Sequence, residues 1–214
     1  MAPAPWPLPP SRQYADWLGE AEVAGLLDWA LSNQRRFKHT RVAGGTLDPA
    51  RRVSRKLGDL GPYREVIEQR IAGKLPEIFG DLGVKPFVPD YVELELVAHG
   101  DGAFFATHAD IPLGANRARA EGGATPRYDR IVSAVYYFHR EPKEFSGGAL
   151  RLYRLDDYRG QGEFTEFEPR QNSLVVFPSW APHEVRKVHL ANPVFEASRF
   201  AVNIWLCRRA NGLA

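Results

Sequence analysis

Apolar residues recur at helical spacing in two stretches of the first ninety residues. The first stretch, EAEVAGLLDWALSNQRRF, covers residues 20–37 and predicts an amphipathic helix. Its regularly spaced apolar residues are Val23, Leu26, Leu27, Ala30 and Leu31. We interpret this stripe as a core surface.

A second helix is predicted over residues 61–79, GPYREVIEQRIAGKLPEIF, where Pro62 stands near the start. Its apolar stripe, also a core surface, consists of Val66, Ile67, Ile71, Leu75 and Ile78. Pro76 lies inside the pattern. It is expected to kink or divide the helix, because proline lacks the backbone N–H that a helix interior uses.

From residue 91 the apolar residues recur at every second position instead of at helical spacing. The run YVELELVAH, residues 91–99, alternates apolar side chains with Glu93 and Glu95, and GDG at 100–102 then turns the chain. Further strand-like runs cover residues 130–138, 148–153, 162–167, 172–177, 183–188 and 198–206. Many short strands separated by turn signals are typical of a sandwich or barrel. The pattern therefore predicts an α+β fold in which N-terminal helices support a barrel-like sandwich.

The 214 residues show no internal repeat and no evident linker, and this length suits one domain. We expect a single domain over 1–214, with mostly helical support in 1–90 and the functional core in 91–208. The formal net charge is only +2, which gives no reason to expect nucleic acid or a membrane as a partner. The single cysteine, the absence of a signal-peptide pattern and the lack of a long apolar run together predict a cytoplasmic location.

The run FFATHADIPL, residues 104–113, places His108 and Asp110 two positions apart, so a strand would direct both to one face. This pairing arises often by chance, and a catalytic metal needs a third ligand. His183, which opens a strand just after FPSWAP, is the best third candidate among the six histidines. Two histidines and one carboxylate form the facial triad of non-haem Fe(II) oxygenases, although zinc uses similar ligands.

An oxygenase of this type also needs an electron donor such as 2-oxoglutarate, whose distal carboxylate requires a cation. Arg199 lies on the apolar run SRFAVNIWL, where an unpaired charge is costly. Its planar guanidinium can bind a carboxylate through two hydrogen bonds. The alternative is an arginine that pairs with a nearby glutamate at the strand end. The long segment 111–129 follows the His-Asp pair directly and is expected to form a lid.

The ordered motifs HAD, VYYF…FSGGALRLY, PHEV and SRFAVNIW resemble the Fe(II)/2-oxoglutarate-dependent oxygenases of the prolyl hydroxylase group, which includes the oxygen-sensing enzymes. The resemblance covers roughly residues 91–208. It implies a double-stranded β-helix, a jelly-roll or cupin-like barrel, with helices on its outer face. It also implies iron ligands at His108, Asp110 and His183, and a 2-oxoglutarate clamp at Arg199.

The same resemblance suggests two further cofactor contacts. Tyr137 matches a residue that donates to the distal carboxylate, and Asn203 stands where the family often has a small hydroxyl residue. His99 stands where many relatives have a tyrosine, so that it either contacts 2-oxoglutarate or lines the pocket. The segment 189–197 lengthens the usual separation between His183 and Arg199.

The resemblance implies a dioxygenase that uses Fe(II), 2-oxoglutarate and dioxygen, with ascorbate as a candidate reductant. Hydroxylation of a prolyl or other residue in a peptide or protein is the leading hypothesis. The alternatives are hydroxylation of a free amino acid or natural-product intermediate, and a non-catalytic cupin-like metal-binding module. Related nucleic-acid demethylases carry a second arginine where this chain has Trp205, which disfavours that activity. Arg130 and Arg186 are candidate substrate contacts or solvated rim charges. The oligomeric state stays open.

Overall fold

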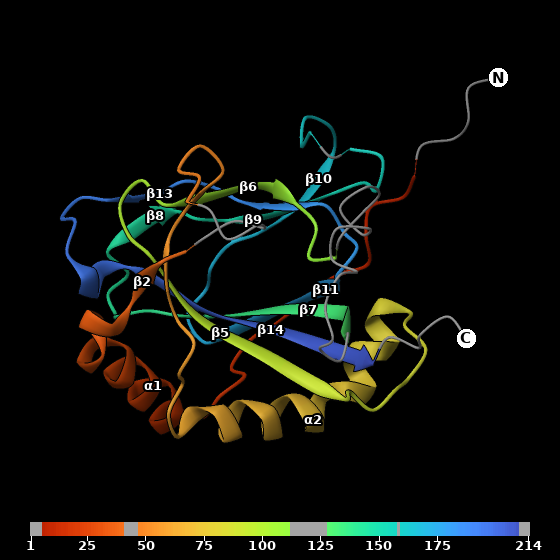
Figure 1. The fold of residues 1–214 in the computed structure, drawn as a ribbon, viewed down its shortest axis with the longest axis horizontal. Coiled ribbons are helices and arrows are strands. Elements are labelled where there is room, and N and C mark those ends of the chain that lie inside the picture. Colours follow the sequence, from red (N-terminus) through yellow and green to blue (C-terminus); the bar gives the residue numbers. More distant parts are fainter. Residues whose placement is uncertain (1–5, 41–46, 112–127, 158, 210–214) are drawn as a thin grey trace.

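Two facing sheets and two helices make up the fold. The computed structural model of the chain describes residues 6–40, 47–111, 128–157 and 159–209. Within these ranges the larger sheet has seven strands in the order β1-β11-β7-β14-β5-β4-β2, and the facing sheet has five in the order β10-β9-β12-β6-β3. A two-stranded pair, β13-β8, completes the strands described. Figure 1 shows the helices beneath the larger sheet and the smaller sheet above it.

The larger sheet is formed by β1 (Arg12–Tyr14), β11 (Ser173–Pro178), β7 (Tyr128–Phe138), β14 (Arg199–Arg209), β5 (Tyr91–His99), β4 (Arg55–Leu57) and β2 (Lys38–His39). The smaller sheet is formed by β10 (Phe164–Phe167), β9 (Leu150–Tyr153), β12 (His183–Val185), β6 (Phe104–His108) and β3 (Arg52–Val53). The remaining pair is β8 (Phe145–Gly147) and β13 (Val188–Leu190). All these pairings are antiparallel, as expected for the jelly-roll barrel, which is the predicted double-stranded β-helix.

The predicted helices are α1 (Glu20–Ser32) and α2 (Tyr63–Leu82). α1 begins at a capping box, in which the Glu22 carboxylate accepts the Gly19 N–H at 2.7 Å. It is shorter than the predicted 20–37, because the chain continues in a separate 3-10 turn (Gln34–Arg36). α2 runs undivided past Pro76 and ends at Gly83, which adopts a left-handed conformation with φ of 61°.

Alternation along the strands assigns the two faces of the larger sheet to two different environments. Even-numbered residues of β14 such as Phe200 and Val202 pack with the helices in one apolar cluster, which also takes Leu96 from β5 and Tyr136 from β7. Ala201 faces the smaller sheet instead and packs in a second cluster with Tyr137, Leu150, Leu152, Val175, Phe177 and Ala181. This second, inner face lies between the two sheets and is where the candidate residues gather.

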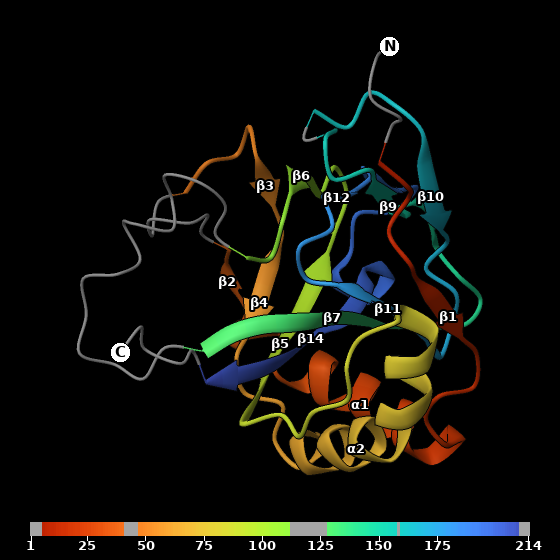
Figure 2. The same ribbon diagram turned by 90° about the vertical axis from the view of Figure 1, so that its right-hand side faces the viewer.

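The N-terminal ninety residues also supply β1, β2, β3 and β4, which the sequence pattern did not predict. These strands have two or three residues each, too few to show an alternating pattern. They extend both sheets at their edges (Figure 2). No helix within the described ranges is long and apolar enough to cross a membrane.

The packing of α2 on the larger sheet generates a stability prediction. Ile71 is 1% exposed in the helix-side cluster, so Ile71→Ala should lower the free energy of unfolding by about 2–5 kcal/mol. Urea unfolding followed by circular dichroism measures the change. Gln69→Ala, on the exposed face of the same helix, is the control and should stay within about 0.5 kcal/mol of the parent. Equal effects of the two changes would contradict this packing.

Candidate metal and 2-oxoglutarate site

Three side chains with metal-binding atoms converge between the sheets at the ends of β6 and β12. One ligand atom from each of His108, Asp110 and His183 lies within 4.8 Å of the others. His108 and His183 are direct cross-strand partners in the β6–β12 pair. Their Nε2 atoms lie 3.8 and 3.7 Å from the two oxygens of Asp110. In the part of the chain that the structure describes, this is the one cluster of at least three such residues.

Both imidazoles are held in the orientation that a metal ligand requires. The Nδ1 of His108 lies 2.9 Å from the carbonyl oxygen of Ala106, and the Nδ1 of His183 lies 2.9 Å from that of Ala181. A carbonyl can only accept, so each Nδ1 carries the proton and each Nε2 keeps its lone pair. Burial, together with the neighbouring His183, lowers the pKa of His108 to about 3. The ring is therefore neutral at physiological pH, as ligation requires.

The carboxylate of Asp110 is fixed by two buried serines. The Ser133 hydroxyl donates to Oδ2 of Asp110 at 2.6 Å, and the Ser179 hydroxyl lies 2.9 Å from that of Ser133. The carbonyl of Ser179 also accepts the Asp110 N–H at 3.1 Å. Burial raises the pKa of Asp110, but the two histidines and the Ser133 hydroxyl outweigh it and leave that pKa lowered. Asp110 is thus an anion whose Oδ1 remains available to a metal.

A buried cation lies on the same inner face. Arg199 is 1% exposed, and its Nη1 lies 3.1 Å from Nδ1 of His99, its cross-strand neighbour on β5. Burial and the adjacent guanidinium lower the pKa of His99 well below its usual range. His99 is therefore neutral and accepts a hydrogen bond through Nδ1. Its ring orients the guanidinium without neutralising it.

Among the residues that the structure describes, the rest of the Arg199 guanidinium has no hydrogen-bond acceptor. Its Nε and Nη2 are buried without a hydrogen bond, and so is the hydroxyl of Tyr137, whose ring lies 4.6 Å from the Arg199 Cζ. A buried cation and donors without an acceptor are costly. A ligand carboxylate would satisfy all these donors together, so these residues fit the distal end of 2-oxoglutarate.

The two glycines of FSGG explain how this pocket closes around Arg199. Gly147 and Gly148 have φ of 69° and 73°, a left-handed conformation that favours glycine. A Cβ on Gly148 would lie 2.7 Å from Cδ of Arg199. The segment 189–197 between His183 and Arg199 contains the last two residues of β13 and the 3-10 turn Phe195–Ala197.

The remaining predicted residues have different surroundings. Asn203 shares the inner face of β14 with Arg199, opposite Glu95 of β5. Arg130 donates to both oxygens of Glu93 at 2.9 and 2.7 Å, and its guanidinium lies 3.9 Å from the Trp205 ring centroid. Its Nη1 is also 3.4 Å from the carbonyl oxygen of Asp110. These contacts make Arg130 part of the wall beside the triad.

Arg186 pairs with Glu184 at 3.1 Å, and the Glu184 side chain alternates with those of His183 and Val185. Glu184 therefore points to the face of β12 away from the triad, and the role of Arg186 in substrate binding stays a prediction. The expected lid, 111–129, lies outside the described residues except for Ile111, Tyr128 and Asp129.

Several residues around the site were missed by sequence reasoning. Ser133 shares the inner face of its strand with Tyr137, so a polar residue within the apolar run was an available signal. Arg52 of β3 lies with its Cζ 4.5 Å from the Phe105 ring centroid, and Phe105 stacks on His108 at 3.5 Å. Nothing in the local sequence pattern identified Arg52.

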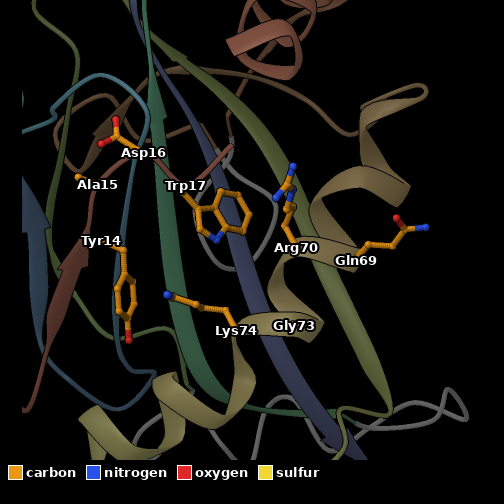
Figure 3. Close-up of a pocket in the computed structure, with 8 residues that line it drawn as sticks. All are labelled: Tyr14, Ala15, Asp16, Trp17, Gln69, Arg70, Gly73 and Lys74. Atoms are coloured by element: carbon orange, nitrogen blue, oxygen red, sulfur yellow. The ribbon is translucent and has the colours of Figure 1, made fainter. Parts of the chain in front are cut away.

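A separate pocket lies away from the triad. A hollow of about 420 Å³ lies on the helix side and is lined by Tyr14, Trp17, Arg70 and Lys74, with Lys74 of α2 extending toward Tyr14 (Figure 3). Its cations already have partners, since Arg70 pairs with Glu22 at 2.9 Å and Lys74 lies over the Tyr14 ring. The larger sheet separates this hollow from the triad.

Comparison with known proteins identifies the family of the chain and structures with a similar fold. The model of the 2OG-Fe(II) oxygenase superfamily matches residues 94–207. An uncharacterized PKHD-type hydroxylase from Synechocystis sp. (strain ATCC 27184 / PCC 6803 / Kazusa) is 37% identical over 150 residues, which are 68% of this chain and 46% of that protein. The chain therefore spans about half the length of this curated relative.

Two solved structures have a similar fold. One is a prolyl hydroxylase from Trichoplax adhaerens, in complex with a hypoxia inducible factor oxygen degradation domain peptide fragment. Its TM-score is 0.63 at 18% identity, over 92% of this chain and 82% of that chain. The other is a Pseudomonas putida prolyl-4-hydroxylase, with a TM-score of 0.60 at 22% identity over 94% of each chain. At these identities the likeness shows the fold alone.

The serine contacts of Asp110 lead to a prediction about metal affinity. Ser133→Ala should weaken Mn(II) binding by about 10- to 100-fold, because the carboxylate loses the donor that fixes its orientation. Titration calorimetry or Mn(II) electron paramagnetic resonance measures the affinity. Ser173→Ala, a buried serine that donates to the Arg170 carbonyl, is the matched control and should leave it unchanged. Unchanged affinity in Ser133→Ala would show that Asp110 is oriented without this bond.

Proposed function

Because the chain belongs to the 2OG-Fe(II) oxygenase superfamily, we propose that it is a 2-oxoglutarate-dependent dioxygenase that hydroxylates a prolyl residue in a peptide or protein. The observation that carries the reaction type is the triad beside a buried cation with unfilled donors. Hydroxylation is supported by the PKHD-type hydroxylase relative, and the prolyl substrate is supported by the prolyl hydroxylases that share the fold.

Each residue of the site has a role in this proposal. His108 and His183 would bind Fe(II) through Nε2, and Asp110 would bind it through its carboxylate. Three protein ligands of this kind leave coordination positions for 2-oxoglutarate and dioxygen. Arg199 and Tyr137 bind the distal carboxylate. Asn203 is a further candidate donor on the same face.

With Fe(II) bound, dioxygen oxidises 2-oxoglutarate to succinate and carbon dioxide, and the second oxygen atom becomes the hydroxyl of the product. The protein binds and orients the reactants for this chemistry. The guanidinium of Arg199 acts in a buried environment, where its attraction to a carboxylate is stronger than in water. His99 limits the rotation of that guanidinium, so less freedom is lost when the ligand binds.

The activity is tested by succinate release from the Fe(II)-loaded protein with 2-oxoglutarate and a panel of proline-containing peptides, with free proline as a comparison. A substrate should raise succinate release and gain one oxygen atom by mass spectrometry. Asp110→Ala should lower turnover by more than about 100-fold, because even outer contacts to a metal site cost 10- to 100-fold. Glu144→Ala, an exposed carboxylate, is the control. Metal binding without succinate release across the panel would indicate a non-catalytic binding module.

The cofactor assignment is tested separately at Arg199. Arg199→Ala should keep Mn(II) affinity and weaken 2-oxoglutarate binding by about 30-fold or more, since truncating one partner of a buried charged pair costs about 2–5 kcal/mol. Arg199→Lys should recover part of the loss, because the charge returns without the two-pronged geometry. Titration of the Mn(II)-loaded protein without oxygen gives both constants. If the alanine variant binds 2-oxoglutarate as tightly as the parent, Arg199 is a structural residue.

A further inference from the structure

One edge of the two-sheet structure carries a concentration of positive charge. β2 and β4 form the edge of the larger sheet, and β3 forms the matching edge of the smaller one (Figure 2). Only Ser54 separates β3 from β4, so the chain crosses from one sheet to the other within this edge. We use the term cationic edge for Lys38, Arg52 and Lys56.

The three side chains share the inner face. Leu57 and Arg55 lie opposite Leu96 and Ala98, which pack toward the helices, so Lys56 between them faces inward. Lys38 lies directly opposite Lys56 in the β2–β4 register. Arg52 is the cross-strand partner of Phe105, whose ring it covers.

The cationic edge is incompletely neutralised. Lys56 and Arg52 both contact one carboxylate, that of Glu95, at 2.5 and 3.1 Å. Lys38 has no ion-pair partner among the described residues, and it stands opposite another lysine. The next pair of this ladder, His39 and Arg55, lies on the other face of the sheet. Like charges directly opposite each other on neighbouring strands are destabilising, so an anion bound here would relieve a cost that the fold carries.

This edge is continuous with the triad. Arg52 covers one face of Phe105, and Phe105 stacks on the imidazole of His108 with ring centroids 3.5 Å apart. β2 is also the outermost strand of its sheet in the described ranges, so it offers main-chain groups to an extended chain. A ligand that contacts Arg52 would therefore be separated from His108 by the Phe105 ring alone.

We propose that the cationic edge binds an acidic segment of an extended peptide substrate, next to the residue presented to the triad. This rests on the proposed function, because it assumes that a peptide enters the site. A few cations beside one carboxylate suit one or two Asp or Glu side chains. A nucleic acid backbone calls for a longer basic surface, and the chain's net charge is only +2.

The test compares two fluorescent proline-containing peptides that are identical except that flanking Asp and Glu residues in one are Asn and Gln in the other. Binding to the full-length protein loaded with Mn(II) and 2-oxoglutarate is measured without oxygen by fluorescence anisotropy. At low salt the acidic peptide should bind at least about 5-fold more tightly than the neutral peptide, and this difference in affinity should shrink as salt is added.

Lys38→Glu should abolish this preference. The change places a carboxylate opposite Lys56, so the ladder gains an attractive pair and the fold should not be weakened. Lys85→Glu, at an exposed position following α2, makes the same change of charge elsewhere and is the matched control. Thermal unfolding of both variants verifies that they are folded.

Equal affinity for the two peptides, or an equal loss of preference in Lys38→Glu and Lys85→Glu, would overturn the proposal. So would a single-stranded oligonucleotide that displaces the acidic peptide at lower concentration than the unlabelled peptide does. Because binding is measured without oxygen, these outcomes do not depend on turnover. A preference for acidic peptides without succinate release would support this inference and contradict the proposed function. Succinate release without the preference would support the proposed function and contradict this inference.

Discussion

The larger sheet has to bury both of its faces, and the rest of the structure depends on how it does so. One face is covered by α1 and α2, and the other faces the smaller sheet. Strict alternation along β14 separates the two environments residue by residue. Phe200 and Val202 contribute to the apolar support, while Arg199 and Asn203 on the same strand face the interior where chemistry can occur.

The interior site is prepared by contacts that do not themselves involve a ligand. Backbone carbonyls two residues before each histidine fix the protonated nitrogen, and a serine pair fixes the carboxylate. Arg199 follows the same principle, because neutral His99 orients its guanidinium while leaving other donors unpaired. Such a site carries a cost in stability that binding can offset, and it is typical of positions selected for function.

The two edges of the structure are not equivalent. At one edge β1 extends the larger sheet through β11. At the other edge the chain passes from β3 of the smaller sheet to β4 of the larger one. Arg52 of β3 lies beside the Phe105 ring, which stacks on His108. The N-terminal region is therefore more than a helical support, because it contributes side chains next to the triad.

The sequence by itself determined the helices, the main strands, the jelly-roll class and the grouping of His108, Asp110 and His183 with a buried Arg199. The helices and strands follow from periodicity, the His108–Asp110 pair from two-residue spacing on a strand, and the interest of Arg199 from the cost of a charge on an apolar strand. The jelly-roll class and the 2-oxoglutarate clamp follow from the resemblance of the motifs to the oxygenase family. Only the tertiary structure decided which distant residues support them. His99, Ser133 and Arg52 reach their partners through cross-strand register and packing, across separations of up to a hundred residues that no local pattern encodes. The short edge strands were missed for the same reason. Two or three residues are too few to show an alternating pattern, and these segments are strands only because they pair with a neighbouring strand.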